Sequence, residues 1–275
     1  MPLSTFHVYS PADFTTWIRS TAFTRNITFI QNHHTFLPSY QNFNNHADHL
    51  FWLESMRSVH INERHWADIG QNITIFPDGF IAVCRPIDKT PAGIFGANTG
   101  AICIENMGDF DIGKDVMTPA QRDSIILTNA LLCIKFDLRP NVAQVVYHHW
   151  FDRAGKRFTA QQINSGAVTQ QQLQKTCPGT AFFGGNTIID AEANFYPLIN
   201  TKINALNGAP APPVNITHKR VNANTLNVRS GRGTQFGIVR KIPGNTIVEV
   251  FEEKDGWSRI SSDKEEWVSS TFLSL

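Results

Sequence analysis

The sequence predicts a mixed α/β (α+β) domain, in which helices flank a central sheet, followed by a small all-β domain. Three observations support this prediction. Short apolar runs bounded by turn residues alternate with helical patterns over most of the chain, which is typical of a mixed sheet covered by helices. Residues 214–275 contain strand and turn patterns only. A proline-rich segment separates the two parts.

The proline-rich segment has the sequence GAPAPP and covers residues 208–213. Its three prolines produce a stiff, extended spacer with no core of its own. We therefore expect one domain over residues 1–207, a linker over 208–213 and a second domain over 214–275. Both domain lengths are ordinary for a chain of 275 residues.

Four apolar segments of the first domain predict buried strands of the central sheet. They are ITFIQNHH (27–34), ITIFPDGFIAVCRP (73–86), GAICIEN (100–106) and AQVVYHH (143–149). Each apolar run is short and ends at turn residues, which favours strands over helices.

Two segments predict helices that pack against this sheet. Thr118 and Pro119 form an N-cap and first-turn pair, and apolar residues follow with helical spacing as far as Ile134. A second helix is expected over residues 186–206, where Pro197 should kink or divide it.

In residues 214–275, the segment IVEVF alternates apolar and polar residues with the period of a strand. Turn signals occur at Ser230-Gly231, Pro243-Gly244-Asn245 and Asp255-Gly256, at the spacing of hairpins. These patterns predict a series of short antiparallel strands.

The composition excludes several classes of protein. The 24 Lys+Arg and 23 Asp+Glu residues leave no basic surplus for a phosphate backbone, so we expect no nucleic acid partner. No apolar run approaches the roughly 20 residues that cross a bilayer, so we expect no membrane span. The N-terminus lacks the features of a signal peptide, and the export route is therefore not indicated.

We expect the protein to be a monomer. Three cysteines lie inside apolar runs and are expected to be buried thiols, namely Cys84, Cys103 and Cys133.

Side chains that can bind a metal lie at the ends of two predicted strands and in one later segment. His33-His34 ends the first strand, His148-His149 ends the last, and Cys177 lies in LQKTCPGTAFFGG. Two imidazoles and a thiolate provide three ligands of a tetrahedral Zn2+ site with an open position for water. Such a water attacks a carbonyl near neutral pH. The alternative is that the histidines are ordinary polar residues and the cysteine a small buried thiol.

Two charged residues are candidates for catalysis at such a site. Lys175 precedes Cys177 by two positions and lies on the same side of an extended segment, where it would stabilise a thiolate or an oxyanion. Glu105 follows a buried apolar run, where an unpaired carboxylate is costly. Glu105 is therefore a general base, the partner of a salt bridge with a residue such as Lys175, or both.

These residues resemble the motifs of the zinc-dependent N-acetylmuramoyl-L-alanine amidases (amidase type 2) of the superfamily of phage lysozymes and peptidoglycan recognition proteins. The similar motifs, in family order between residues 25 and 205, are His33-His34-Thr35, Trp66–Gly70, Pro77–Gly79, Ile102–Glu105, His148 and Lys175–Gly179. The two histidines combined with Lys-x-Cys-Pro-Gly are specific, whereas each motif alone is weak.

The resemblance implies that His33, His148 and Cys177 hold the zinc ion. The choice of His148 over His149 follows the family pattern, in which the ligand comes directly after the strand. The implied reaction is hydrolysis of the amide bond between N-acetylmuramic acid and L-alanine in peptidoglycan.

The resemblance also implies that Glu105 is the general base and that Lys175 stabilises the tetrahedral intermediate. Gln71 departs from the family pattern, because many relatives have a tyrosine at this position. An amide cannot accept a proton near neutral pH, so the base role falls to Glu105. The insert over residues 151–172 also departs from compact relatives, and we expect a loop at the rim of the cleft.

The second domain resembles bacterial SH3-like (SH3b) modules. The similar residues are Leu226–Gly231, Thr234, Gly256-Trp257 and Glu266-Trp267-Val268. The resemblance implies a small barrel of about five strands that targets the enzyme to cell-wall peptides. Trp257 is either a peptide-binding residue or part of the small core.

The sequence therefore predicts a zinc amidase that degrades peptidoglycan in the periplasm or outside the cell. Two alternatives remain open. A non-catalytic peptidoglycan recognition protein shares the fold; such proteins usually lack the cysteine ligand, and Gln71 alone favours this alternative. A zinc peptidase that cuts another amide of the stem peptide uses the same chemistry, and the substrate-binding cleft determines which amide bond is hydrolysed.

Overall fold

The computed structural model describes residues 6–165, 176–208, 216–261, 264 and 266–274. The chain divides into two compact units, Met1–Gly208 and Ala209–Leu275. Lys175, residues 166–172 of the predicted insert and residues 209–213 of the predicted linker lie outside the described residues. Within the described part of the chain, no helix combines the length and the apolar character that crossing a bilayer needs.

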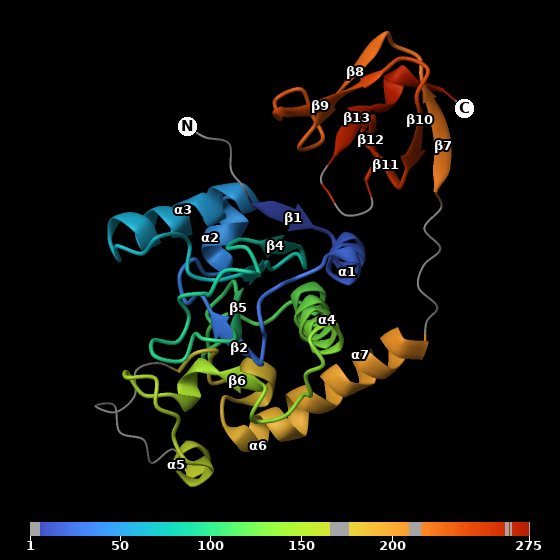
Figure 1. Ribbon diagram of the computed structural model, residues 1–275. Helices are drawn as coiled ribbons and strands as arrows, with labels where there is room; N and C mark the ends of the chain where they lie inside the picture. The colour runs from blue at the N-terminus through green and yellow to red at the C-terminus, as the bar shows by residue number, and fades with distance from the viewer. Residues whose placement is uncertain (1–5, 166–175, 209–215, 262–263, 265, 275) are drawn as a thin grey trace. The chain divides into compact units, whose positions relative to one another are not determined.

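The first unit is built on a six-stranded mixed sheet with helices on both faces (Figure 1). The strands are β1 (His7–Tyr9), β2 (Phe29–His34), β3 (Ile73–Ile75), β4 (Ile81–Val83), β5 (Ala101–Asn106) and β6 (Val145–Tyr147). Their order is β1-β4-β3-β5-β2-β6. Strand β5 is parallel to β2 and β3, β6 is parallel to β2, and β4 is antiparallel to β1 and β3. The predicted mixed α/β class is confirmed.

The helices of this unit are α1 (Pro11–Ser20), α2 (Tyr40–Asn45), α3 (His49–Asn62), α4 (Pro119–Lys135), α5 (Ala160–Ser165), α6 (Ile188–Asp190) and α7 (Tyr196–Gly208). Helix α4 begins as predicted, because the Thr118 hydroxyl accepts a hydrogen bond from the Gln121 N–H. The second predicted helix is divided into α6, a π-helical segment over Ala191–Phe195, and α7. The division falls directly before Pro197, which has no N–H to donate to the preceding turn.

The two faces of the sheet pack against different helices. A large apolar core joins one face to α1, α4 and α7, and it includes Ile102 and Ile104 of β5. A smaller core lies on the other face beneath α2 and α3, and it includes Phe43, Leu53 and Cys84. Because successive side chains of a strand alternate between faces, Cys103 and Glu105 of β5 lie on the face opposite α4.

The same alternation places two residues of β2 beside them. Asn32 of β2 hydrogen bonds to Asn129 of α4 and therefore faces that helix. Its neighbours Gln31 and His33 consequently lie on the opposite face, next to Cys103 and Glu105 of the paired strand β5. This strip of polar side chains in the sheet is where the candidate site is found.

The second unit consists of strands in two antiparallel sheets, with the orders β10-β7-β14 and β11-β12-β13-β8-β9. The strands are β7 (Thr217–Val221), β8 (Thr225–Arg229), β9 (Ile238–Pro243), β10 (Ile247–Val250), β11 (Glu252–Lys254), β12 (Trp257–Arg259), β13 (Trp267–Ser269) and β14 (Leu273–Ser274). The predicted all-β class is confirmed, and β10 alternates exposed and buried residues as its sequence predicts. Trp267 is buried, whereas Trp257 is half-buried.

The pairing among the described strands of this unit does not close into the expected barrel. The turn at Pro243-Gly244-Asn245 joins β9 of one sheet to β10 of the other instead of closing a hairpin. The Gly244 N–H donates to the Asn224 carbonyl and the Asn245 N–H to the Val221 carbonyl, so the turn is fixed against the β7–β8 connection.

The buried pair Asn32–Asn129 generates a prediction about stability. The two amides exchange hydrogen bonds of 2.9 and 3.1 Å, and both side chains have 0% exposure. Asn129→Ala leaves the Asn32 amide without this partner in an apolar layer, so we expect the free energy of unfolding to fall by about 1–3 kcal/mol. Urea denaturation measures the change, with the exposed Asn200→Ala as control. Equal stability of the two variants would contradict the prediction.

Candidate metal centre

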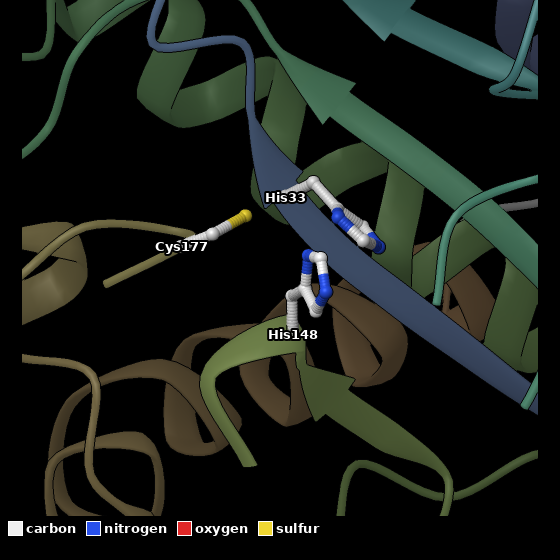
Figure 2. Close-up of side chains that lie close together, drawn as sticks. All are labelled: His33, His148 and Cys177. Atoms are coloured by element: carbon white, nitrogen blue, oxygen red, sulfur yellow. The ribbon is translucent and has the colours of Figure 1, made fainter. Parts of the chain in front are cut away.

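His33, His148 and Cys177 converge at the carboxyl ends of β2 and β6. Each offers one ligand atom, and these three atoms lie within 4.8 Å of one another (Figure 2). The convergence of the histidines follows from strand register. Asn32 pairs with Tyr147 in the parallel ladder, so the next residue on each strand is a histidine, and the two rings are 4.7 Å apart between centroids.

Backbone hydrogen bonds fix Cys177 to the ends of the same two strands. The His149 N–H donates to the Cys177 carbonyl at 2.7 Å, and the His34 N–H donates to the Cys177 Sγ at 3.3 Å. A backbone donor stabilises negative charge on the sulfur, and the thiolate is the form that binds metal. The residue that follows each candidate histidine thus helps to place the cysteine.

Asp111 holds the segment on both sides of Cys177. Its Oδ2 accepts a hydrogen bond from the Thr176 hydroxyl at 2.8 Å, and its Oδ1 accepts one from the Thr180 N–H at 2.9 Å. Burial raises the pKa of Asp111, but the hydrogen bonds from Thr180 and Thr176 and the nearby His34 outweigh burial, and the net pKa is lowered. Asp111 could not be predicted from the sequence, because no local pattern links it to a segment more than sixty residues away.

Glu105 lies beside His33 as a result of the parallel pairing of β2 and β5, in which these two residues are partners. The Glu105 Oε1 is 3.9 Å from the His33 Nδ1. The Glu105 side chain is 22% exposed, whereas that of His33 is 3% exposed. Lys175, predicted to lie near both, is outside the described residues.

A second group, His33, Cys103 and Glu105, also brings possible ligand atoms within 4.8 Å. Complete burial raises the pKa of Cys103 well above its usual value, and the charges of Glu105 and Cys177 act in the same direction. Burial thus disfavours the thiolate of Cys103, which is the form that binds metal. His33, His148 and Cys177 form the better set of ligands, and two imidazoles with one thiolate are a donor set that fits zinc.

The remaining cysteines and Gln71 lie in buried layers. Cys84, Cys103 and Cys133 are buried and free, as the sequence predicts. Gln71 is 1% exposed, and its amide donates to the Thr74 hydroxyl at 3.0 Å. Thr74 is the partner of Glu105 in the pairing of β3 with β5. Gln71 is therefore linked to the neighbourhood of Glu105 through the Thr74 hydroxyl.

The first part of the predicted insert forms a tight turn and a short helix. Phe151 and Arg157 form an isolated antiparallel bridge, and Asp152 accepts hydrogen bonds from the Ala154 and Lys156 N–H groups. Helix α5 follows. Residues 166–172 of the insert lie outside the described residues, so its expected place at a cleft rim stays a prediction.

The fold and this group of side chains define a class of protein: a mixed α/β domain with a possible His-His-Cys metal site at the ends of parallel strands, followed by a small all-β unit. Residues 23–180 match the family model of N-acetylmuramoyl-L-alanine amidase, and residues 224–274 match that of the bacterial SH3 domain. The chain belongs to the N-acetylmuramoyl-L-alanine amidase family and carries a bacterial SH3 domain.

Solved structures with detectable similarity include an amidase and peptidoglycan recognition proteins. N-acetylmuramoyl-L-alanine amidase LysC from Clostridium intestinale URNW is 21% identical, with a TM-score of 0.41 over 66% of this chain and 87% of that chain. Drosophila PGRP-LB is 18% identical, with a TM-score of 0.43 over 62% and 82%. Drosophila peptidoglycan recognition protein SA is 17% identical, with a TM-score of 0.44 over 63% and 82%. A comparison with curated proteins gave no match.

The lowered pKa of Asp111 generates a prediction about pH. Its carboxylate contributes stability above its unfolded pKa of about 4, and this contribution is lost as the pH falls through the lower folded pKa. We expect Asp111→Ala to reduce the free energy of unfolding by roughly 1 kcal/mol at neutral pH. The difference from the wild type should shrink as the pH falls below the unfolded pKa of about 4.

Urea denaturation across this pH range measures the effect. The matched control is Asp123→Ala, whose side chain is 74% exposed on α4. A difference between wild type and Asp111→Ala that does not change with pH would show that the carboxylate charge has no part in holding the Cys177 segment.

Proposed function

We propose that this protein is a zinc-dependent amidase that hydrolyses the bond between N-acetylmuramic acid and L-alanine in peptidoglycan. The observation that carries the proposal is the convergence of His33, His148 and Cys177 in a chain of the amidase family. Two imidazoles and a thiolate hold zinc with one coordination position left for water or substrate.

In the proposed mechanism, zinc acts as a Lewis acid, and Glu105 and Lys175 act as general base and oxyanion-stabilising group. When bound, zinc supplies a Lewis acid that activates water and polarises the scissile carbonyl. Glu105, beside His33 and partly exposed, accepts the proton of the attacking water and returns it to the leaving amine of L-alanine. Lys175 precedes Cys177 by two residues and stabilises the oxyanion of the tetrahedral intermediate.

The bacterial SH3 domain is proposed to bind peptides of the cell wall. Tethering to the polymer raises the concentration of substrate that the amidase domain encounters, without any new contact at the active site. Trp257, half-buried in β12, is a candidate for the peptide contact. The proposed place of action is accordingly the periplasm or the cell exterior.

The proposed reaction predicts a specific product. Digestion of purified peptidoglycan should release free stem peptides that begin with L-alanine, and mass spectrometry identifies these ends. A zinc chelator should abolish the release, and added zinc should restore it. Peptides cut at an internal amide would indicate a peptidase instead, and binding of peptidoglycan without any cleavage would indicate a recognition protein; either result contradicts the proposed amidase.

The two adjacent histidines provide a matched pair of variants for the same assay. His148→Ala should lose both bound zinc and activity, because it removes one of three ligands. His149→Ala should keep both, since it is the backbone N–H of His149 that holds Cys177. Zinc content is measured on the purified proteins. Loss of zinc in His149→Ala alone would reverse the proposed ligand choice.

Glu105→Gln tests the base. The amide keeps the size of the side chain but cannot accept a proton, so we expect kcat to fall by about 10²- to 10⁴-fold while bound zinc is retained. The exposed Glu63→Gln is the control for loss of a carboxylate. A kcat of Glu105→Gln within about twofold of the wild type would remove Glu105 from the proposed mechanism.

A further inference from the structure

Gln31 connects His33 to a loop on the same face of the sheet. It precedes His33 by two positions on β2, and its side chain is completely buried. Its Nε2 donates a hydrogen bond of 2.6 Å to the Ala97 carbonyl, and its Oε1 lies 3.4 Å from the His33 Nε2. One amide group thus contacts both the loop and a candidate metal ligand.

The chemistry of these contacts fixes the orientation of the amide. The Ala97 carbonyl can only accept a hydrogen bond, so the NH₂ end of Gln31 must face it. The amide oxygen is consequently turned toward His33. Because this oxygen also can only accept, its contact of 3.4 Å with the His33 Nε2 favours the neutral ring that carries its proton on Nε2, and it is shorter than the 3.9 Å between Nδ1 and the Glu105 Oε1.

This tautomer determines which nitrogen is available to a metal. A neutral imidazole has one proton, so protonation at Nε2 leaves a lone pair at Nδ1 of His33. Nδ1 is also the nitrogen 3.9 Å from the Glu105 Oε1. Of the two ring nitrogens, Nε2 thus faces Gln31, and Nδ1 is the one beside the proposed base.

The loop that orients Gln31 is itself tightly fixed. The Asn98 Oδ1 accepts hydrogen bonds from the Gly93 and Ile94 N–H groups at 2.9 and 3.0 Å. Gly93 packs directly on the amide, since a Cβ at this position would lie 2.4 Å from the Gln31 Oε1 and 2.8 Å from the Cys103 Sγ. Any side chain at position 93 would therefore displace the oxygen that faces His33.

We infer that Gln31 is a positioning residue that selects the Nε2-protonated tautomer of His33 and so presents Nδ1 to the metal. The tautomer follows from the contacts of Gln31, whereas its use in metal binding rests on the proposed function. A partner that fixes the proton on the second nitrogen of a ligating histidine typically changes metal affinity by about 10–100-fold. Gln31 does this through an amide held by Ala97.

Three variants separate this role from a purely structural one. Gln31→Met has a similar length but no acceptor, and it should lose the tautomer preference of His33. Gln31→Glu, protonated in this buried position, donates its O–H to the Ala97 carbonyl and keeps an acceptor toward the His33 Nε2, so it should keep the preference. Gln121→Met is the matched control, because Gln121 is an equally buried glutamine that donates to the Ile75 and Met107 carbonyls. It should lower stability and leave His33 unchanged.

Two measurements are made on each protein. Imidazole nitrogen shifts, recorded by NMR on metal-free protein at a pH of about 8, report the tautomer of His33 in its neutral form. Competition with a chelator gives the zinc dissociation constant, which should increase by about 10–100-fold in Gln31→Met and change little in the other two variants. If Gln31→Met fails to fold, Gly93→Ala provides the same test, because it moves the Gln31 oxygen without removing it.

The outcomes are distinguishable. A wild-type His33 protonated at Nδ1, or an unchanged tautomer and zinc affinity in Gln31→Met, overturns the inference. The predicted tautomers combined with no zinc binding by the wild type would uphold the effect of Gln31 on His33 and contradict the proposed function. The predicted tautomers with weakened zinc binding in Gln31→Met support both.

Discussion

The candidate site depends on the parallel pairing of β2 with its two neighbouring strands. Parallel strands end at the same edge of a sheet, and the register sets His33 opposite Glu105 on β5 and one residue beyond the last pair with β6, next to His148. A shift of one residue would turn the His33 side chain to the face occupied by α4. The buried Asn32–Asn129 pair fixes which side chains of β2 point toward α4. It therefore also keeps His33 on the face of the site.

Contacts outside the strand pairing position Cys177 and orient the His33 ring. Cys177 comes from a segment remote from the sheet in sequence, and backbone donors of His34 and His149 together with Asp111 hold this segment. Gln31 acts from within β2. The face beneath α2 and α3 is thus apolar around β4 but polar along β2 and β5 and at Thr74 of β3. The fold therefore divides this sheet face into an apolar core and a polar site.

The sequence predicted the strands and helices whose signals are local. Apolar runs gave the four main strand segments, and Thr118-Pro119 gave the start of α4. Helix α1 was missed although Ser10-Pro11 is an equivalent cap. Residue types at strand ends indicated the two histidine pairs and Cys177, but the choice of His33 and His148 came from the family pattern, because convergence depends on pairing between distant strands. Asp111 and Gln31 were not found, since their contacts lie in loops remote in sequence. The antiparallel all-β class of the second unit was predicted, but the pairing of the strands that the structure describes shows no closed barrel, because turn signals do not reveal which strands pair.

X-ray absorption spectroscopy of the zinc-loaded protein tests the central claim most directly, because it reports the atoms bound to the metal. The proposed site requires one sulfur at ~2.3 Å and nitrogen or oxygen ligands at ~2.0–2.1 Å, and the sulfur should disappear in Cys177→Ser. A spectrum without sulfur, or a sulfur that persists when Cys177 is replaced, would contradict a site built from His33, His148 and Cys177.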